Sequence, residues 1–416
     1  MNSKLLNLLA LLLFLQFSCF LVIVPASAEV LLSIDCGSSS LKPHTDANSI
    51  VWVGDNSYIR SGETHKVMID PPDIKAWDSN VMSTLRAFPT RKKNCYSIDI
   101  EDKSKDSTTP NATRVLVRAS FYYGNYDNKL TPPTFNLQFN GNSWTQIVTH
   151  QDYIIYTEMV YSLIKGHNIS ICLAQTQPDN IPFISALEVR NVSNLEFPGR
   201  FAYSYVDSNY PVFFSERFAF AGANTTIRYP DDMYDRIWGP VYTNLRVKSN
   251  SPYQSVNTDD KPLEALRTTL TQLQEVKGVQ QCPCVAAKVI NDDEPPEIAL
   301  RRTHLYSSGN MVYDGISDPK IPIHYNAYFT EVNILNSTEK RSFNILVNNE
   351  FYKGPIVPSP LYLEKVFIHN ITSFAVNSSH SIALVPTNDS TLPPLIIALE
   401  GFTVGDKLVQ GTNSSD

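Results

Sequence analysis

An internal repeat is the feature that most constrains how this chain can fold. The phrase F-N-L-Q-F-N-G at residues 135–141 returns as F-N-I-L-V-N-N at 343–349, and P-F-I-S-A-L-E at 182–188 returns as P-L-I-I-A-L-E at 394–400. In both halves the first phrase precedes the second by a similar interval, which indicates that a whole module was duplicated. We therefore expect two related domains side by side.

Length and composition agree with two β-rich domains. The chain has 416 residues, more than the roughly 250–300 residues at which a single core stops growing. Its 27 prolines and 18% charged residues favour a loop-rich chain over a helical bundle. The formal net charge is −7 and no long basic run is present, so nucleic acid is not an expected partner.

Alternating apolar residues predict strands in both halves of the chain. Every second residue is apolar from 115 to 121 and from 135 to 139, and the same period recurs at 327–329 and 343–347. Side chains two apart lie on one face of a strand, so each half can line its own core. The pattern predicts two β-sandwiches.

One segment departs from this β pattern. A helix is predicted from Asp260 to Gly278, where an N-terminal cap, leucines at helical spacing and a stop follow in order. The stretch 280–308 has no clean period and carries several prolines and acidic residues, which indicates a loop or an insertion.

The amino-terminal residues resemble a secretory signal. Residues 5–24 are an apolar run after Lys4, and the small residues of P-A-S-A precede Glu29, so residues 1–28 are interpreted as a signal peptide. An uncleaved signal anchor is the alternative, because the run is about long enough to span a bilayer. We expect a secreted protein of residues 29–416 that ends in a polar tail, 406–416.

Glycosylation motifs point to the same compartment. Nine asparagines begin an N-x-S/T motif without a central proline. An occupied site must lie at the surface, so the glycans would restrict where a partner can dock. These asparagines are Asn111, Asn168, Asn191, Asn224, Asn336, Asn370, Asn377, Asn388 and Asn413.

The cysteine count predicts one or two disulfides and an unpaired thiol. Five cysteines remain after the leader: Cys36, Cys95, Cys172, Cys282 and Cys284. Cys36 can be paired with Cys95 or with Cys172, and spacing alone does not decide. Cys282 and Cys284 resemble half of a metal or redox motif, but no second Cys or His pair lies near them, so no metal site is expected.

Four motifs together carry a family resemblance. They are I-D-C-G at 34–37, N-C-Y at 94–96, I-C-L at 171–173 and R-Y-P-D-D-M-Y-D-R-I-W at 228–238. With them, most of residues 30–405 resembles the plant malectin-like domain. A departure lies at 274–319, where the family is usually shorter.

The resemblance implies an all-β architecture, a tandem pair of malectin-type, jelly-roll-like β-sandwiches at residues 29–196 and 197–405, the second with an irregular insertion at about 274–319. In that family the pair forms the outer part of receptor-like kinases, often followed by leucine-rich repeats, a membrane helix and a kinase. No leucine-rich array, H-R-D or D-F-G kinase motif, or spanning helix follows Glu400. The resemblance implies recognition without built-in signalling.

A tyrosine-rich stretch is the candidate ligand site. Malectin itself binds glucosylated glycans through aromatic rings and polar groups at the loop end of its sandwich, and rings with nearby amides and carboxylates suit sugars chemically. The alternative is that these rings close the core at a strand end. In the second half the matching run, Tyr328–Asn333, has fewer rings. The candidate ligand-binding residues are Tyr122, Tyr123, Asn125, Tyr126 and Asp127.

The acidic residues of the fourth motif invite comparison with a cation site. Asp231, Asp232 and Asp235 lack the glycine and the ligand order of a calcium loop. We interpret them as turn-capping residues that pair with Arg228 and Arg236.

Enzyme motifs find little support, and two kinds of ligand stay open. G-x-S-x-G, H-E-x-x-H, G-x-G-x-x-G and the phosphate loop are absent, although sequence alone cannot reveal a pair of glycosidase carboxylates. We expect a non-catalytic, cofactor-free recognition module that binds a cell-wall or other carbohydrate through loops of the first sandwich. The alternative is a scaffold or soluble decoy that binds a secreted peptide, receptor kinase or co-receptor in the cleft between the sandwiches. Membrane association is expected only through a partner or an uncleaved anchor.

Overall fold

The protein is nearly all β, as predicted. Besides its strands, the described part of the chain contains one short α-helix, α2 (Ser79–Met82), and a 3-10 turn, η1 (Asp55–Ser57). The predicted leader and the predicted helix at 260–278 lie outside the described residues, within which no helix is long and apolar enough to cross a bilayer. The computed structural model describes residues 30–40, 42–72, 78–99, 113–163, 168–192, 203–220, 226–232, 234–240, 245–248, 295–296, 310–331, 335–360, 363–376 and 378–409.

The first sandwich packs one sheet against strands of two smaller sheets. One layer is formed, in spatial order, by β2 (His44–Thr45), β3 (Val51–Gly54), β1 (Val30–Asp35), β13 (Ala186–Asn191), β7 (Thr113–Phe121) and β10 (Ile155–Leu163). The other contains β6 (Lys93–Ile98), β11 (Ile169–Gln175), β8 (Thr134–Phe139) and β9 (Asn142–Val148), beside β12 (Phe183–Ile184), β5 (Thr84–Ala87) and β4 (Glu63–Lys66).

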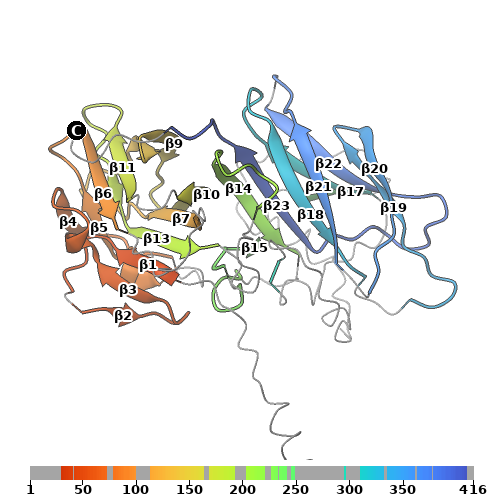
Figure 1. Ribbon diagram of the computed structural model, residues 1–416, viewed down its shortest axis with the longest axis horizontal. Coiled ribbons are helices and arrows are strands. Elements are labelled where there is room, and N and C mark those ends of the chain that lie inside the picture. Colours follow the sequence, from red (N-terminus) through yellow and green to blue (C-terminus); the bar gives the residue numbers. More distant parts are fainter. Residues whose placement is uncertain are drawn as a thin grey trace, which may run out of the picture.

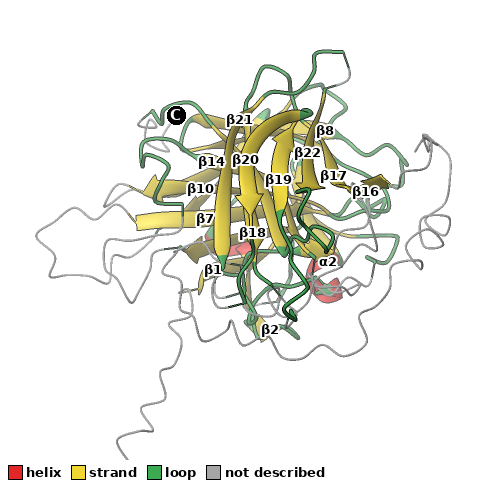
Figure 2. Ribbon diagram, turned by 90° about the vertical axis from the view of Figure 1, so that its right-hand side faces the viewer, coloured by secondary structure: helices red, strands yellow, loops and turns green. Residues whose placement is uncertain are grey.

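The second sandwich has the same plan, and its two layers can be followed in Figure 2. One layer contains β14 (Val212–Ala219), β23 (Ala398–Val404), β18 (Ile323–Phe329) and β21 (Glu364–Ile371), with β15 (Gly239–Pro240) beside β14. The other contains β16 (Leu245–Lys248), β17 (Asn310–Ile316), β22 (Ser379–Pro386), β19 (Phe343–Val347) and β20 (Glu350–Ile356).

The sequence repeat is a structural repeat. The strand order β1-β13-β7-β10 of the first sandwich corresponds to β14-β23-β18-β21 of the second, and β6-β11-β8-β9 corresponds to β17-β22-β19-β20. The first repeated phrase forms the hairpins β8–β9 and β19–β20, and both of its turns have two residues at positive φ: Asn140 and Gly141, then Asn348 and Asn349. Asn and Gly adopt this conformation readily, which explains why the phrase ends in N-G and N-N.

Period-two alternation produces the two cores. In β8 the apolar side chains Phe135, Leu137 and Phe139 are all buried in the first core, and Phe343 and Ile345 of β19 are buried in the second. Part of the expected insertion is not irregular. Residues 310–316 form β17, which pairs with β22 inside the second sandwich and places Tyr313 in its core.

The two sandwiches are joined by a shared sheet. Strand β14 pairs with β10 of the first sandwich, with Glu158 opposite Phe214 and Val160 opposite Val212, and its other edge pairs with β23. Figure 1 shows β10, β14 and β23 running side by side through the middle of the molecule. The tandem arrangement is therefore a continuous hydrogen-bonded sheet that passes through two cores.

The carboxy-terminal segment makes a second connection. After β23 the chain returns to the first sandwich, where the Val409 amide donates to Asn142 Oδ1 at 3.0 Å and Asn142 Nδ2 donates to the Val409 carbonyl at 3.2 Å. The Leu408 amide donates to the Asn209 carbonyl at 2.8 Å. Residues 405–409 thus bridge the two sandwiches, as the dark blue strand end shows in Figure 1.

One disulfide differs from the expected pairing. Cys95 of β6 and Cys172 of β11 are bonded, with Cα atoms 4.0 Å apart, because these neighbouring antiparallel strands place the two residues opposite each other. Cys36 is a free, buried thiol in the first core, so its predicted pairing with Cys95 or Cys172 is wrong. Burial raises the pKa of the Cys36 thiol well above its usual range. Cys282 and Cys284 lie outside the described residues.

Candidate functional site: the loop after β7 and the sandwich junction

The predicted ligand loop begins where β7 ends, and its rings are buried. Tyr122, Tyr123 and Tyr126 are 1%, 0% and 6% exposed. The Tyr123 and Tyr126 rings are 5.5 Å apart and both contact Phe183 of β12, at 6.1 and 5.6 Å between centroids. Tyr122 packs in a separate cluster with Trp52. A covered ring face cannot stack on a sugar, so the stacking role predicted for these tyrosines does not fit the structure.

The polar groups of this loop bind the loop itself. Asn125 is 7% exposed and has a φ of 52°, and its Oδ1 accepts from the Leu130 amide at 2.9 Å. The Tyr123 hydroxyl donates to Asp127 Oδ1, and burial together with this carboxylate raises the pKa of Tyr123 to about 12. The Gly124 carbonyl accepts from the Met68 amide at 2.7 Å. The five predicted residues therefore do lie together, but they close the end of the sandwich.

The matching run of the second sandwich is also internal. Tyr328 and Phe329 are fully buried, and Glu331 forms a buried ion pair with Arg341 at 2.7 Å. The rest of the run to Asn333 lies outside the described residues. Neither loop presents aromatic faces from its described residues.

A buried charge network occupies the junction between the sandwiches. Its residues come from the outward face of the shared sheet, opposite the cores, and from the connection at 226–238. All of them are at most 4% exposed. The network contains the basic residues Arg118, Arg190, Arg217, Arg228 and Arg236 and the acidic residues Glu158, Glu188, Asp232, Asp235 and Glu400.

Asp235 lies at the centre of this network. Its Oδ2 is 2.7 Å from Arg228 Nη2, 2.8 Å from Arg190 Nε and 3.4 Å from Arg118 Nη1. Burial alone would raise the pKa of Asp235, but the three guanidinium groups outweigh burial and lower it. Such a carboxylate stays charged, and removing it would leave three buried cations with Glu188 as their remaining shared partner.

The carboxylates of the sheet bridge neighbouring arginines. Glu158 Oε1 is 2.6 Å from Arg118 Nε, and its second oxygen binds Arg217. Glu188 Oε2 is 3.1 Å from Arg118 Nη1 and 2.8 Å from Arg228 Nη2. Burial alone would raise the pKa of both acids, but the arginines lower it by a larger amount, so the net direction is downward. Glu158 and Arg217 thereby tie β10 to β14 across the shared sheet.

The fourth motif folds over this network. The Ile227 amide donates to the Trp238 carbonyl at 2.9 Å and closes a loop. Within it Asp232 binds Arg236 at 2.9 Å and accepts from Trp238 Nε1 at 2.8 Å. The predicted pairing of these aspartates with Arg228 and Arg236 is confirmed for Asp232 and Asp235. Asp231 is exposed.

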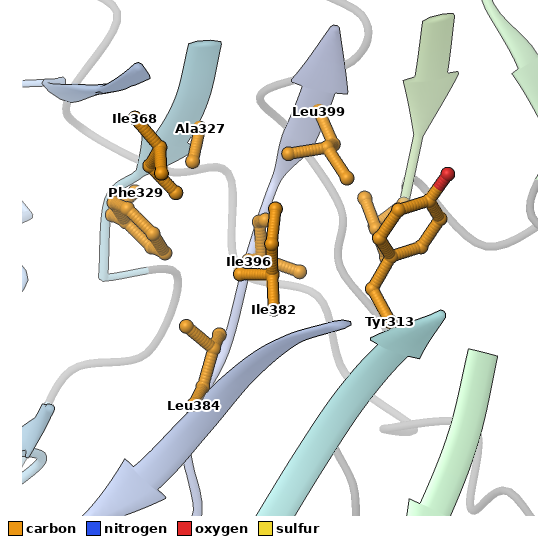
Figure 3. A pocket seen from close by; sticks show the side chains of 9 residues that line it. Tyr313, Ala327, Phe329, Ile368, Ile382, Leu384, Ile396 and Leu399 are labelled. Carbon is orange, nitrogen blue, oxygen red and sulfur yellow. The ribbon is translucent and has the colours of Figure 1, made fainter. Parts of the chain in front are cut away.

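The described residues contain no metal cluster, and the cavity between the layers of the second sandwich is small. Among the described residues no group of three or more His, Cys, Asp or Glu side chains is placed to hold a metal ion. A cavity of about 20 Å³, room for about one water molecule, lies between the layers of the second sandwich. Figure 3 shows that Phe329, Ile382 and Leu399 point into it, so it is an apolar packing gap in the core.

Comparison with known proteins shows which family has this architecture. The Malectin-like domain profile matches residues 34–404. The chain belongs to the malectin-like family. Among its malectin-like relatives, an uncharacterized Arabidopsis thaliana protein, At1g24485, is 29% identical over 409 residues, which covers 97% of this chain and 69% of the relative. The probable leucine-rich-repeat receptor-like serine/threonine-protein kinase At5g59680 of the same plant is 28% identical over 94% of this chain.

This malectin-like chain spans 39% of the length of that kinase. Its fold matches the ectodomain of Arabidopsis thaliana ANX2, with a TM-score of 0.64 and 15% identity over 92% of this chain and all of the other. It also matches a chain in the crystal structure of the plant peptide RALF23 in complex with FER and LLG2, with a TM-score of 0.59 and 14% identity over 94% of this chain and 97% of that one. The chain thus has the fold of receptor-kinase ectodomains.

The charge network was the main feature that sequence reasoning missed. A signal was present, because Glu188 and Arg190 alternate with apolar residues inside a strand, as does Arg118. On an exposed sheet face such charges would be ordinary. Only the strand order shows that Glu158, Arg118 and Glu188 lie in one row across three neighbouring strands.

Proposed function

We propose that this chain is a non-catalytic recognition module that acts outside the cell and binds a secreted peptide together with a co-receptor. One observation carries the proposal. At the loop end of the first sandwich the aromatic rings are buried, and two apolar side chains beside them are exposed among polar ones. Met68 is 67% exposed and Leu130 is 60% exposed.

Met68 and Leu130 flank the same closed loop. The Met68 amide binds the Gly124 carbonyl, and the Leu130 amide binds Asn125 Oδ1. Flexible aliphatic side chains on a rigid base are suited to apolar contacts with a peptide, whereas a sugar needs flat rings and free polar groups. No glycosylation motif occurs in 42–72 or 122–133, so the face is not blocked by a predicted glycan there.

Predicted glycans disfavour the opposite choice, an end of the second sandwich. Asn336 and Asn388 are exposed in neighbouring turns, which are tied by the ion pair of Lys340 with Asp389 and by the Lys340 amide donating to Thr391 Oγ1 at 2.7 Å. Two glycans at that end would exclude a docked protein. The structural match to a receptor chain crystallised with a peptide and a co-receptor supports the same class of partner.

The test measures binding of the secreted chain, residues 29–416, to synthetic RALF23 with and without LLG2, the probes that the matched complex supplies. We expect saturable binding that Met68→Asp and Leu130→Asp each weaken by about tenfold or more, since each places a charge in an apolar contact. Val148→Asp is the matched control, because Val148 is 64% exposed on β9. Absence of binding, or equal loss in all three variants, would contradict the proposal.

Carbohydrate binding is the second candidate, and a different pair of rings favours it. Tyr153 is 60% exposed, and its ring centroid is 4.3 Å from that of His150. An array of cell-wall and glucosylated oligosaccharides tests this candidate. Binding lost in Tyr153→Ala would establish it, whereas binding lost in Tyr123→Phe, which keeps the buried ring, would restore the loop of Tyr122–Asp127 as the site.

A further inference from the structure

Four aromatic rings form a connected patch on the outward face of the second sandwich. We call Tyr205, His324, Phe367 and His369 the Phe367 patch, because the other three rings all contact Phe367. Their centroids lie 5.2, 5.8 and 5.8 Å from it, and His324 is stacked at 14°. Phe367 is 37% exposed and Tyr205 is 41% exposed. Aromatic surface that stays open to water on an otherwise packed sheet is expected to have an occupant.

A glycosylation motif begins beside this patch. Asn370 follows Phe367 by three residues on β21, starts the motif N-I-T, and is exposed, as is Thr372. The backbone N–H of Asn370 donates to His324 Nδ1, with 3.4 Å between the two nitrogens. The residue that carries the attachment atom Nδ2 is therefore hydrogen-bonded through its backbone to a ring of the patch.

A β-bulge sets the position of Asn370. The pairing of β18 with β21 shifts between Ile323 and Tyr325, and Asn370 has a φ of 56°. A bulge re-aims the side chain next to it, and asparagine tolerates this backbone conformation better than most residues. Ile371 returns to the core at 2% exposure, so the irregularity is confined to the residues next to the patch.

We propose that Asn370 carries an N-linked glycan whose first N-acetylglucosamine units pack on the Phe367 patch. In the transfer, Asn370 Nδ2 forms a bond to C1 of the first sugar, the bond from C1 to a lipid-diphosphate donor breaks, and the amide proton leaves with the diphosphate. The sugar's C–H groups and N-acetyl methyl then cover ring surface that would otherwise face water. The inference requires entry into the secretory pathway and is independent of the ligand proposed above.

The other exposed motifs of the second sandwich have a different setting. Asn336 lies in a turn where its Oδ1 accepts from the Thr338 amide at 3.0 Å and from Thr338 Oγ1 at 2.7 Å. A glycan there would extend from a polar turn. Asn388 is likewise exposed in a turn between β22 and the following segment. These motifs serve as controls for the patch.

The first experiment establishes occupancy and its effect on stability. The chain is secreted from a glycosylating host, glycopeptides are mapped by mass spectrometry, and Thr372→Ala is compared with the control Asn388→Gln. We expect Asn370 to be occupied and Thr372→Ala to lower Tm by about 1–3 °C, the shift that an aromatic contact of ordinary strength gives in a chain of this size. Asn388→Gln should leave Tm unchanged. An unmodified Asn370 would overturn the proposal.

The second experiment asks whether the stabilisation passes through the rings. Phe367→Leu keeps the apolar volume but removes the flat face. In that background Thr372→Ala should no longer lower Tm, as a double-mutant cycle for a direct contact requires. Independently, ring currents should shift the N-acetyl methyl resonance of the first sugar upfield in the unaltered protein and not in Phe367→Leu. Equal Tm losses in both backgrounds, with an unshifted methyl resonance, would refute contact with the patch.

Discussion

The outward faces of the two sandwiches occupy matching positions in the repeat and have different chemistry. Strand register aligns Glu188 of the first sandwich with Glu400 of the second. It also aligns three residues around Glu188 with three residues around Glu400. The first sandwich has Arg118, Glu158 and Arg190, where the second has Asn326, Phe367 and Phe402. Only the glutamate is kept.

The difference follows from what covers each face. Strand β10, which carries Glu158, is paired by β14 and lies under the connection 226–238, so its face is buried and its charges must be paired. Strand β21, which carries Phe367, is an edge strand with an open face. The comparison teaches that one duplicated sheet serves as a joint in the first sandwich and, at its edge strand β21, as surface in the second.

The largest effect on stability is expected at the glutamate that both sandwiches share. Glu188→Gln would leave Arg118, Arg190 and Arg228 to share Asp235 with one buried counter-charge fewer, and should lower the free energy of unfolding by about 3–5 kcal/mol. Glu400→Gln keeps bonds to Tyr203 and Asn326 around a single arginine, Arg217, and should cost roughly 1–3 kcal/mol.

Urea denaturation of the secreted variants measures both costs. Asp231→Asn, at an exposed position of the same connection, is the control and should change stability little. Equal losses in Glu188→Gln and Glu400→Gln would contradict the distinction between the two faces.

The disulfide offers the next test, because the second sandwich has no cysteines at the two matching positions. Register places Val312 and Ala383 of β17 and β22 where the first sandwich has Cys95 and Cys172. The double variant Cys95→Val with Cys172→Ala gives the first sandwich the residues of the second. It should lower the unfolding free energy by about 2–5 kcal/mol, since the lost disulfide closes a span of 77 residues. Thermal unfolding without reductant checks it, and an unchanged Tm would show that the bond adds nothing to the packed strands.

Acidification should act on the two sandwiches in opposite directions. Burial lowers the pKa of His380 in the second sandwich to about 4, so its stabilising neutral form is lost as pH falls from about 6.5 toward 4. Burial, partly offset by the hydroxyls of Thr84 and Ser38, raises the pKa of Asp35 in the first sandwich to about 6, so stability is gained as pH falls through that value.

Variants separate these two contributions. Between pH 7 and pH 5, His380→Gln should reduce the loss of stability by roughly 1–2 kcal/mol, and Asp35→Asn should increase it by about 1 kcal/mol. Glu216, whose pKa is raised by burial and which reaches His380 through the Tyr325 hydroxyl, should offset part of the His380 effect. Denaturation curves at both pH values measure the difference, and variants that move in the same direction would be inconsistent with these environments.

The smallest expected effect concerns the bridge formed by residues 405–409. Asn142→Ala removes both bonds to Val409 and should cost about 0.5–1.5 kcal/mol. Its clearest readout is faster hydrogen exchange of the Leu408 and Val409 amides. Gln146→Ala, on the same strand, removes a bond to Asn136 within the first sandwich and should leave that exchange unchanged.

Sequence reasoning predicted the fold because the alternation is a local property and the repeat is visible in the order of residues alone. The same is true of the pairing of Asp232 with Arg236, which lie four residues apart. Sequence alone left two interpretations of the tyrosine loop open, because burial of its rings depends on Phe183, about sixty residues downstream, which only folding brings to Tyr123 and Tyr126. The disulfide pairing was predicted wrongly and the charge network was missed for a related reason, since both depend on which strands become neighbours.

Binding of the secreted chain, residues 29–416, to RALF23 and LLG2, beside an oligosaccharide array, tests the central claim most directly. The account predicts peptide binding that Met68→Asp weakens and Tyr123→Phe leaves unchanged. Oligosaccharide binding that is lost in Tyr123→Phe, with no response to the peptide, would contradict it and return the function to the loop that the structure shows closed.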